Sequence, residues 1–551
     1  MAATRYLDEI RALVRPRGDL LALLVLIAAL TYYALFRVDF GGPPFEDAAM
    51  LMRYAEHVAQ GHGVVWNVGA PPVDGATDFL FMASAAAFIK SGLSTGRAIR
   101  ILGLGAHVLT VLLVYWVNRR IWKAGVLPSL LTALYLAVGT GLWYVAAYFG
   151  TPFFALFASL TWFLALLLMQ ADEPGQWMHW TFAICGLITG LIRPEGVVLA
   201  VLMLLSVSAV RGWRRSSRTV IIFAIIMLTF GGAYFAWHWQ YFGYPLPNPY
   251  YKKGGGLLHW DSFWESLGYL LRFAGPVALA FILGLRSRRT RRLTLAFIGP
   301  LLVFAASFVL VSNETNFGGR FQYALWPLVL ISFYPLVDGI DLESGVTKWP
   351  RANWAWVLAG LVVAFSLLRY SANQACSLTA QQHTCGIAYE ADGRYDVARI
   401  LAEYRGDGYV IATTEAGLLP LYSGWTAIDT WGLNDIWIAH HGEVTTEYLD
   451  AHRPEVIVFH AYFSPLVPPK TTEKDLAHDW HRMTLTLKSY AESNHYALAA
   501  AFGDSPYESH YYYVRQDFPD SERIVRDISN LRTYYWFATG KKAINYAGVN
   551  P

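Results

Sequence analysis

Apolar runs of about 15–20 residues, separated by short polar loops, recur along residues 19–369 and limit what this chain can fold into. The first run covers residues 19–36 and is long enough to span a bilayer. Of the 551 residues, 55% are apolar and 15% are charged, and the apolar residues cluster in these blocks. The sequence therefore predicts a polytopic α-helical membrane protein.

The distribution of basic residues indicates in which direction each of these runs crosses the membrane. Arginines precede the first run, which we interpret as an uncleaved signal anchor with a cytoplasmic N-terminus. Residues 79–89 form an apolar stretch of about half the required length, so we expect it to lie in the interface or to re-enter. The basic clusters 211–218 and 286–292 then both fall on the cytoplasmic side. Further crossings are expected near 97–117, 127–143, 152–170, 178–192, 196–210, 219–239, 266–285, 293–311, 320–337 and 352–369, which makes about eleven helices.

An odd number of crossings places the chain after about Tyr370 outside the cytoplasm. There the sequence gains charges and alternates apolar runs, such as 456–459, with helical patterns. This predicts an extracytoplasmic α/β domain over 371–551, following a membrane domain over 1–370. The α/β domain has neither a glycine-rich phosphate loop nor a nucleophile elbow, so we expect it to cover the membrane site or to hold an acceptor.

The chain has three cysteines, of which Cys185 lies inside an apolar run. Cys376 and Cys385 lie close together in the extracytoplasmic part, where thiols can remain oxidised. A disulfide between them is the natural interpretation, with two free thiols as the alternative. No cysteine or histidine spacing is typical of a structural zinc site, and we expect His440, His441, His478 and His481 to be solvated or structural.

The acidic pair Glu46-Asp47 follows the first membrane-spanning run directly, in a loop of about residues 37–96. Pro43-Pro44 suits a helix start, and Asp47, Tyr54 and His57 follow helical spacing that would put them on one face. Carboxylates in the first turn of a helix are stabilised by its dipole, which is the structural alternative to catalysis by this pair.

Several motifs in the outer loops accompany the acidic pair. They are Gly61-His62-Gly63 and Trp66-Asn67 in the first loop, Arg193-Pro194-Glu195-Gly196 in the third, residues 241–253 (YFGYPLPNPYYKK) in the fourth, and Asn316-Phe317-Gly318-Gly319-Arg320-Phe321 beyond it. Taken together and in order, these motifs resemble those of the GT-C glycosyltransferases, membrane enzymes that take sugars from polyprenyl-phosphate donors. A further element, DTWGLND at 429–435 after Glu415-Ala416-Gly417, resembles one in a subset that includes the mycobacterial arabinofuranosyltransferase B-like proteins.

The resemblance implies a GT-C-like fold and a catalytic carboxylate in the first loop. Asp47, aided by Glu46, is expected to deprotonate an acceptor hydroxyl as its oxygen attacks the anomeric carbon, and a single displacement inverts that carbon. Arg320 is expected to bind the donor phosphate, with snorkelling at a helix end as the alternative. Independently of the resemblance, Arg193 and Glu195 are expected to pair with each other, with direct contact to substrate as the alternative. The further donor-phosphate candidates are Lys252, Lys253 and Asn248, and the substrate-contact candidates are His57, Tyr54, Trp66 and Tyr251.

The implied partners are a polyprenyl-phosphate sugar donor, a glycan, lipid or protein acceptor, and the bilayer of a plasma or inner membrane. A divalent metal such as Mg²⁺ or Mn²⁺ near the acidic loop stays open, because GT-C enzymes differ in this respect. The net charge of +3 is too small to indicate a nucleic-acid partner. The alternatives are a transporter or flippase of a lipid-linked sugar and a noncatalytic scaffold; ionisable residues are nearly absent from the helix middles, where transport pathways usually need them.

Overall fold

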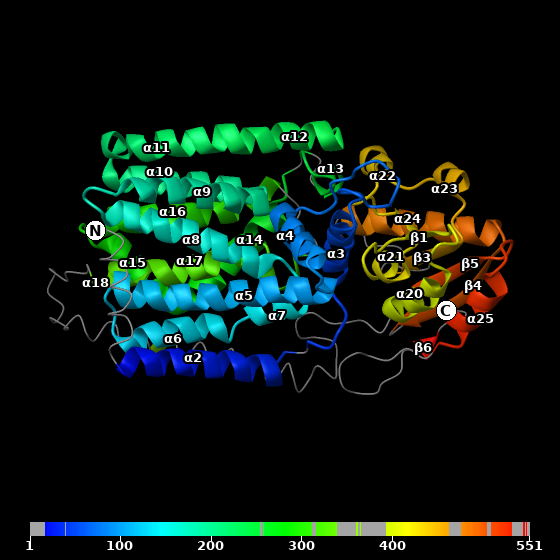
Figure 1. Ribbon diagram of the computed structural model, residues 1–551, viewed down its shortest axis with the longest axis horizontal. Helices are drawn as coiled ribbons and strands as arrows, with labels where there is room; N and C mark the ends of the chain where they lie inside the picture. Colours follow the sequence, from blue (N-terminus) through cyan, green and yellow to red (C-terminus); the bar gives the residue numbers. More distant parts are fainter. Residues whose placement is uncertain are drawn as a thin grey trace.

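The computed structural model describes residues 17–38, 40–253, 256, 258–310, 316–338, 360–361, 364, 393–461, 475–503, 509–531, 544–545 and 547. Within these residues, a bundle of long helices and an α/β domain lie end to end along the long axis of the molecule (Figure 1). The expected disulfide between Cys376 and Cys385 lies outside the described residues.

The bundle confirms the prediction of a polytopic helical membrane protein. In the part of the chain that the structure describes, seven segments are long and apolar enough to cross a membrane: Gly18–Phe36, Thr95–Ile121, Val126–Ala146, Thr151–Gln170, Trp213–Phe242, Trp260–Arg286 and Arg291–Leu310. The apolar helix at Phe79–Lys90 is too short to count among them, as the sequence predicts. The total of eleven crossings stays a prediction, because most of the expected crossing at 352–369 lies outside the described residues.

The helices of the bundle run largely parallel or antiparallel to one another (Figure 1). Their bounds are α2 (Arg17–Phe36), α4 (Phe79–Lys90), α5 (Thr95–Trp116), α6 (Val126–Ala137), α7 (Gly141–Ala146), α8 (Thr151–Gln170), α9 (Gln176–Ile192), α10 (Glu195–Arg211), α11 (Trp213–Ile226), α12 (Gly232–Phe242), α14 (Trp260–Ala274), α15 (Ala278–Arg286), α16 (Arg291–Ser307), α17 (Leu325–Ser332) and α18 (Tyr334–Asp338).

Helix α17 lies at the centre of the bundle, and every one of its residues is buried. Trp326 stacks on Phe273 of α14 with ring centroids 5.3 Å apart, and Ser332 accepts a hydrogen bond from Trp162 of α8 at 2.8 Å. Because this packing fixes α17, it also fixes the start of the helix, where Arg320 lies five residues upstream of Leu325.

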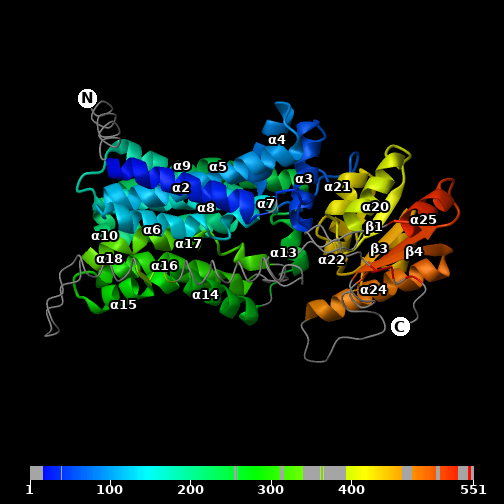
Figure 2. The same ribbon diagram turned by 90° about the horizontal axis from the view of Figure 1, so that it is seen from below.

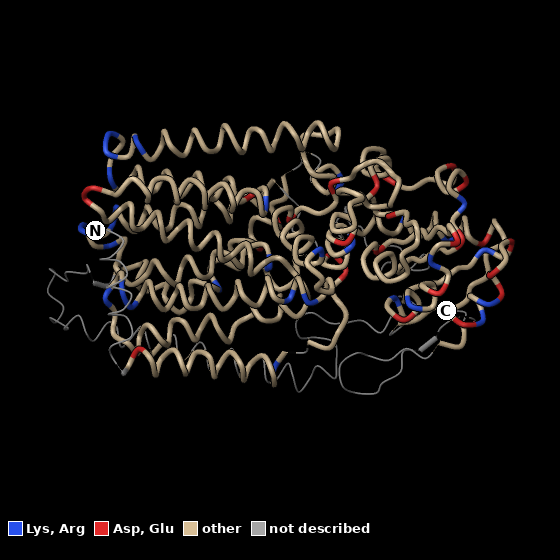
Figure 3. The backbone as a smooth tube through the Cα atoms, in the orientation of Figure 1, with Lys and Arg blue, Asp and Glu red and all other residues tan. Residues whose placement is uncertain are grey.

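Charged residues gather at the two ends of the bundle, and the helix middles are nearly free of them (Figure 3). The end far from the α/β domain carries mostly Lys and Arg, including those at the start of α11 (Figure 3). Asp19 is buried at that end and pairs with Arg119 at 2.8 Å. This segregation is what the positive-inside rule leads one to expect for a cytoplasmic face, and the orientation of the termini stays a prediction.

The α/β domain contains a mixed sheet with strand order β2-β1-β3-β5-β4-β6. Strand β1 pairs in parallel with β2 and β3, and β5 runs antiparallel to both β3 and β4. Strand β3 has four consecutive buried residues, as expected for a strand covered on both faces. The strands are β1 (Val410–Thr413), β2 (Thr426–Asp429), β3 (Val456–His460), β4 (Tyr496–Gly503), β5 (Ser509–Arg515) and β6 (Ile544–Asn545); the helices are α20 (Arg394–Leu401), α21 (Leu418–Ser423), α22 (Ile436–His441), α23 (Thr446–His452), α24 (Asp475–Ser493) and α25 (Ser521–Ser529).

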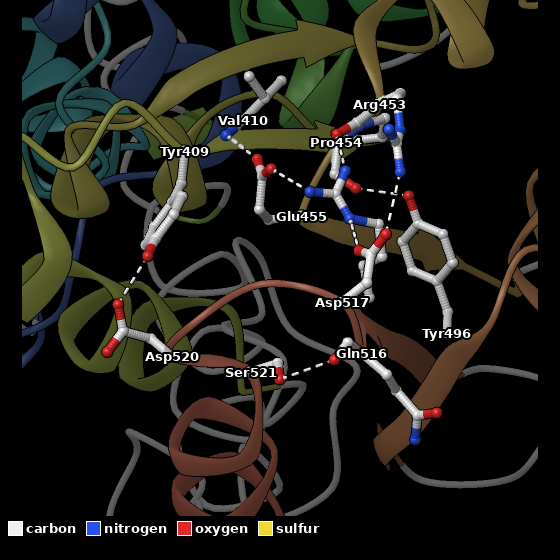
Figure 4. A network of polar contacts seen from close by, with 11 residues as sticks. Tyr409, Val410, Arg453, Pro454, Glu455, Tyr496, Gln516, Asp517, Asp520 and Ser521 are labelled. Carbon is white, nitrogen blue, oxygen red and sulfur yellow. Dashed lines mark hydrogen bonds and ion pairs between the residues drawn. The ribbon is translucent and has the colours of Figure 1, made fainter.

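A polar network holds the β1–β3–β5 part of the sheet at its end away from the bundle (Figure 4). Glu455 accepts hydrogen bonds from the backbone N–H of Val410 at 2.7 Å and from Arg515 at 2.6 Å. Tyr409 donates to Asp520 at 2.6 Å, which ties the segment before β1 to the start of α25. This end is therefore fixed by side chains, and the opposite end of the sheet faces the bundle.

Two short helices lie between the bundle and the sheet (Figure 2). They are α3 (Glu46–Ala59), which packs against α4 and α21, and α13 (Asn248–Lys253), which packs against α22. Both come from outer loops of the membrane domain, so these loops form the junction with the α/β domain.

Candidate functional site

Helix α3 begins at Glu46, one residue after the Pro43-Pro44 pair and with Phe45 as its N-cap, which confirms the helix predicted at the acidic residues. Both acids lie in its first turn, where the helix dipole stabilises carboxylates. The two side chains nevertheless have different partners: Asp47 contacts the membrane domain, and Glu46 contacts the α/β domain.

The carboxylate of Asp47 forms an ion pair with the guanidinium of Arg320. The Arg320 side chain is buried, with 7% exposure, whereas the Asp47 side chain keeps 24%. The guanidinium lies over the rings of Phe149 at 4.3 Å and Phe321 at 4.9 Å. Its buried Nε–H has no hydrogen-bond partner among the described residues. Arg320 therefore retains a donor that an anionic ligand could use.

Electrostatics keep Asp47 ionised. Burial alone would raise the pKa of Asp47, but the charges of Arg320 and Lys253 outweigh it, and the pKa lies below its ordinary value. Asp47 is therefore a carboxylate at neutral pH, able to accept a proton.

A second arginine lies beside the first. Arg193 pairs with Asp78 at 3.0 Å and with Glu195 at 2.6 Å, and its guanidinium lies 5.2 Å from the Phe321 ring that Arg320 also contacts. The expected pairing of Arg193 with Glu195 is confirmed. Asp78 makes no capping hydrogen bond to α4, and burial raises its pKa.

Glu46 faces the α/β domain. It pairs with Arg394 at 2.9 Å and accepts a hydrogen bond from the backbone N–H of Leu418 at 3.0 Å. A Cβ on Gly417 would lie 2.1 Å from the Glu46 carboxylate, so only glycine permits this approach. Arg394 also pairs with Glu415 at 2.8 Å. In this structure Glu46 connects the first loop to the α/β domain, and its assistance to catalysis stays a prediction.

The fourth loop places its two lysines in different surroundings. Lys252 donates a hydrogen bond to the carbonyl of Gly442, and its ammonium lies 4.2 Å from the centre of the Trp431 ring. Lys253 lies close enough to Asp47 to lower its pKa. Of the two lysine candidates for the donor phosphate, Lys253 is therefore the one whose charge acts on Asp47.

The other two candidates of this loop contact the α/β domain. The amide of Asn248 donates to the carbonyls of Gly432 at 2.9 Å and Leu433 at 3.0 Å. The ring of Tyr251 lies 4.7 Å from that of His440. Contact of either residue with a donor or substrate stays a prediction.

The element at 429–435 builds the loop that Asn248 binds. Asp429 is buried and accepts hydrogen bonds from the backbone N–H groups of Trp431, Gly432 and Asn434 at 2.8–3.1 Å. Its burial raises the pKa to about 6. The Asp429 side chain therefore stabilises the loop whose carbonyls, at Gly432 and Leu433, accept hydrogen bonds from Asn248 of the membrane domain.

The remaining substrate-contact candidates also lie at the junction. Tyr54 is fully buried and donates to Asn434 at 3.0 Å; Gly75 leaves room for this contact, since a Cβ there would lie 2.7 Å from the Tyr54 hydroxyl. Trp66 has 2% exposure and donates to the carbonyl of Ala427 at 3.0 Å. His57 contacts the carbonyl of Val65 at 2.9 Å, and burial lowers its pKa to about 4. These contacts hold the first loop in place, and a role in substrate binding stays a prediction for all three.

Two buried arginines make contacts across the junction, and the sequence predicts no function for either. Arg53, with 4% exposure, donates to the carbonyls of Trp66 at 2.8 Å and Trp425 at 2.9 Å, and Arg394 pairs with Glu46 and Glu415. In the sequence, only the position of Arg53 on the helix that starts at the acidic pair indicates that it lies near the site.

Comparison with known proteins adds to this description. A family model described as a domain of unknown function (DUF8728) matches residues 382–517, within the region of the α/β domain. No curated protein matches the chain. The solved structure of ArnT from Cupriavidus metallidurans bound to undecaprenyl phosphate is similar, with a TM-score of 0.58, 12% identity, and coverage of 90% of this chain and 98% of that chain. The apo structure of the same protein gives a TM-score of 0.56, 14% identity, and coverage of 93% and 98%. The protein thus shares its overall fold, a bundle of long apolar helices followed by an α/β domain, with ArnT.

Proposed function

We propose that this protein is a membrane glycosyltransferase that transfers a sugar from a polyprenyl-phosphate-linked donor to a cell-envelope acceptor at the extracytoplasmic face. The observation that carries the proposal is the ionised, partly exposed Asp47 in contact with the buried Arg320, whose Nε–H has no hydrogen-bond partner in the described part of the chain. The ArnT fold supports it, since one ArnT structure is bound to undecaprenyl phosphate.

The donor phosphate would bind at Arg320. A guanidinium fork matches the geometry of phosphate oxygens, and Arg193 and Lys253 add positive charge nearby. A phosphate that binds the guanidinium of Arg320 competes with Asp47 for the same N–H groups. Donor binding would therefore release the Asp47 carboxylate from its ion pair and make it available as a base.

The chemical step is a single displacement. Asp47 accepts the proton of an acceptor hydroxyl while that oxygen forms a bond to the anomeric carbon of the sugar. The bond between this carbon and the phosphate oxygen breaks, and the lipid phosphate leaves with the electron pair, stabilised by Arg320 and Lys253. The anomeric carbon is inverted, and the products are the glycosylated acceptor and the free polyprenyl phosphate.

A metal at the acidic loop has little support from the geometry. Glu46 and Asp47 each face a guanidinium, which disfavours a cation between the two carboxylates. No step of the proposed mechanism depends on a metal. Whether transfer requires Mg²⁺ or Mn²⁺ is left open by the sequence, and addition of a chelator to the transfer assay decides it.

The test is transfer of labelled sugar from a panel of polyprenyl-phosphate pentoses and hexoses into membrane acceptors by the purified, reconstituted protein. The resemblance of the element at 429–435 to arabinofuranosyltransferases makes a polyprenyl-phosphate arabinofuranose the first donor to try. Donor-dependent formation of labelled product supports the proposal. Movement of the lipid-linked sugar across the bilayer without product would contradict it and favour a transporter, and absence of both activities would favour a scaffold.

A further inference from the structure

Two histidines lie face to face on neighbouring strands of the α/β sheet. His460 at the end of β3 is directly opposite His510 of antiparallel β5 in the strand register. Their rings are parallel within 5°, and the ring centroids are 4.3 Å apart. Residues directly opposite each other on antiparallel strands project to the same face of the sheet, so both imidazoles serve one site.

A carboxylate from a third segment joins them. Glu415 follows β1 and forms a hydrogen bond through Oε2 with Nε2 of His510, while Nδ1 of His460 lies 4.0 Å from the same oxygen. One ligand atom from each of the three residues lies within 4.8 Å of the other two. The side chains are 1% exposed for His510, 12% for His460 and 21% for Glu415, so the site is enclosed but open on the Glu415 side.

This spacing is close to that of a metal site. Ligand atoms around a tetrahedral zinc ion lie about 3.3 Å apart, so small side-chain movements would bring all three within bonding distance. Two imidazole nitrogens and one carboxylate oxygen form a ligand set used by zinc enzymes, with water completing the coordination. Mg²⁺ and Mn²⁺ prefer oxygen ligands and fit this set less well.

The second oxygen of the carboxylate is already oriented. Oε1 of Glu415 forms an ion pair with Arg394 at 2.8 Å, and Oε2 contacts the histidines. Ligating carboxylates are commonly oriented by such contacts outside the coordination sphere. Arg394 supplies one positive charge between Glu415 and Glu46.

We infer that Glu415, His460 and His510 bind a first-row divalent transition metal, with zinc as the best match to the ligands. The site lies within the α/β domain and goes beyond the proposed glycosyl transfer, none of whose steps uses it. A bound ion would fix Glu415 and, through Arg394, the contact of Glu46 with the α/β domain. Its expected contribution is therefore to the stability of the junction.

The test is metal binding by the untagged full-length protein in detergent, after treatment with a chelator and dialysis. Calorimetric titration with Zn²⁺ should give one equivalent bound with micromolar or tighter affinity, and Mg²⁺ should not bind at this site. Titration with Co²⁺ should give the visible absorption bands of a cobalt ion with nitrogen ligands. Each of His460→Ala and His510→Ala should weaken Zn²⁺ binding about 10-fold or more, which corresponds to at least about 1.4 kcal/mol.

The matched control is His452→Ala, which removes an exposed histidine from α23 of the same domain and should leave Zn²⁺ binding unchanged. If the buried His510 variant does not fold, His460→Ala and Glu415→Gln carry the test, because both side chains are more exposed. One equivalent of Zn²⁺ retained by a folded His460→Ala/Glu415→Gln double variant would overturn the inference. Absence of saturable Zn²⁺ binding by the wild type would also overturn it and leave a hydrogen-bonded histidine–glutamate cluster.

Discussion

The carboxylate of Asp47 and the guanidinium of Arg320 form an ion pair although 273 residues separate them in the chain. Asp47 comes from the first turn of α3, and Arg320 comes from the segment before the buried helix α17. Two elements that pack independently thus bring a carboxylate and a buried cation together at the end of the membrane bundle. This pair is the basis of the proposed transfer.

The pH dependence of transfer should reflect this ion pair. Burial alone would raise the pKa of Asp47, but Arg320 and Lys253 lower it below the ordinary value of about 4. Ionised Asp47 therefore stabilises the fold above that pH, and this stabilisation is lost as the pH falls through the lowered pKa. The wild-type kcat/KM should stay constant from pH 7 down to about pH 5, because it reports groups of the free enzyme.

Arg320→Gln removes the main charge that lowers this pKa, so the acid limb of its kcat/KM profile should move to higher pH. Donor KM should rise in the same variant because the phosphate loses its fork. An acid limb at the wild-type position in a variant that is folded and still measurably active would contradict the assignment of the limb to Asp47.

Single substitutions of the two lysines of the fourth loop should have different effects. Lys253→Ala should raise the KM for the donor about 10-fold, because it removes a cation near the Asp47–Arg320 pair. Lys252→Ala should lower the melting temperature and leave that KM unchanged, because Lys252 contacts Gly442 and Trp431 of the α/β domain. Equal effects of the two substitutions on KM would show that the loop binds the donor through both lysines.

Glu46 should act as a positioning residue. Glu46→Gln keeps an acceptor for the Leu418 N–H but loses the ion pair with Arg394, so it should lower the free energy of unfolding by about 1–3 kcal/mol. Activity should fall about 10-fold or less, and the pH profile should keep its shape.

A double-mutant cycle of Glu46→Gln with Arg394→Gln measures the same contact directly, and a coupling of about 1 kcal/mol or more is expected. Glu173→Gln, in the exposed loop between α8 and α9, is the control. A loss of activity in Glu46→Gln as large as that of an Asp47 variant, at unchanged stability, would instead make Glu46 the base.

Much of the architecture could be predicted because hydropathy is a local property. The long apolar runs became the helices of the bundle, the acids after Pro43-Pro44 began a helix, and Arg193 pairs with Glu195 two residues away. Each of these features depends on residues that are close in the sequence.

The junction could not be predicted because its contacts join distant segments. Nothing near Glu46 indicates that it meets Arg394, and nothing near Asn248 indicates that its amide binds the carbonyls of Gly432 and Leu433. The pairing of His460 with His510 depends on the register of two strands, which the sequence does not state.

The most direct test of the central claim is sugar transfer by Asp47→Asn at matched amounts of folded protein, with a donor that supports wild-type activity. Asparagine keeps the shape of the side chain and cannot accept the proton, so the rate should fall about 10²–10⁴-fold. Asp172→Asn, an exposed position in the loop between α8 and α9, should match the wild type. Transfer by Asp47→Asn at the wild-type rate would show that Asp47 is not the base and would contradict the proposed mechanism.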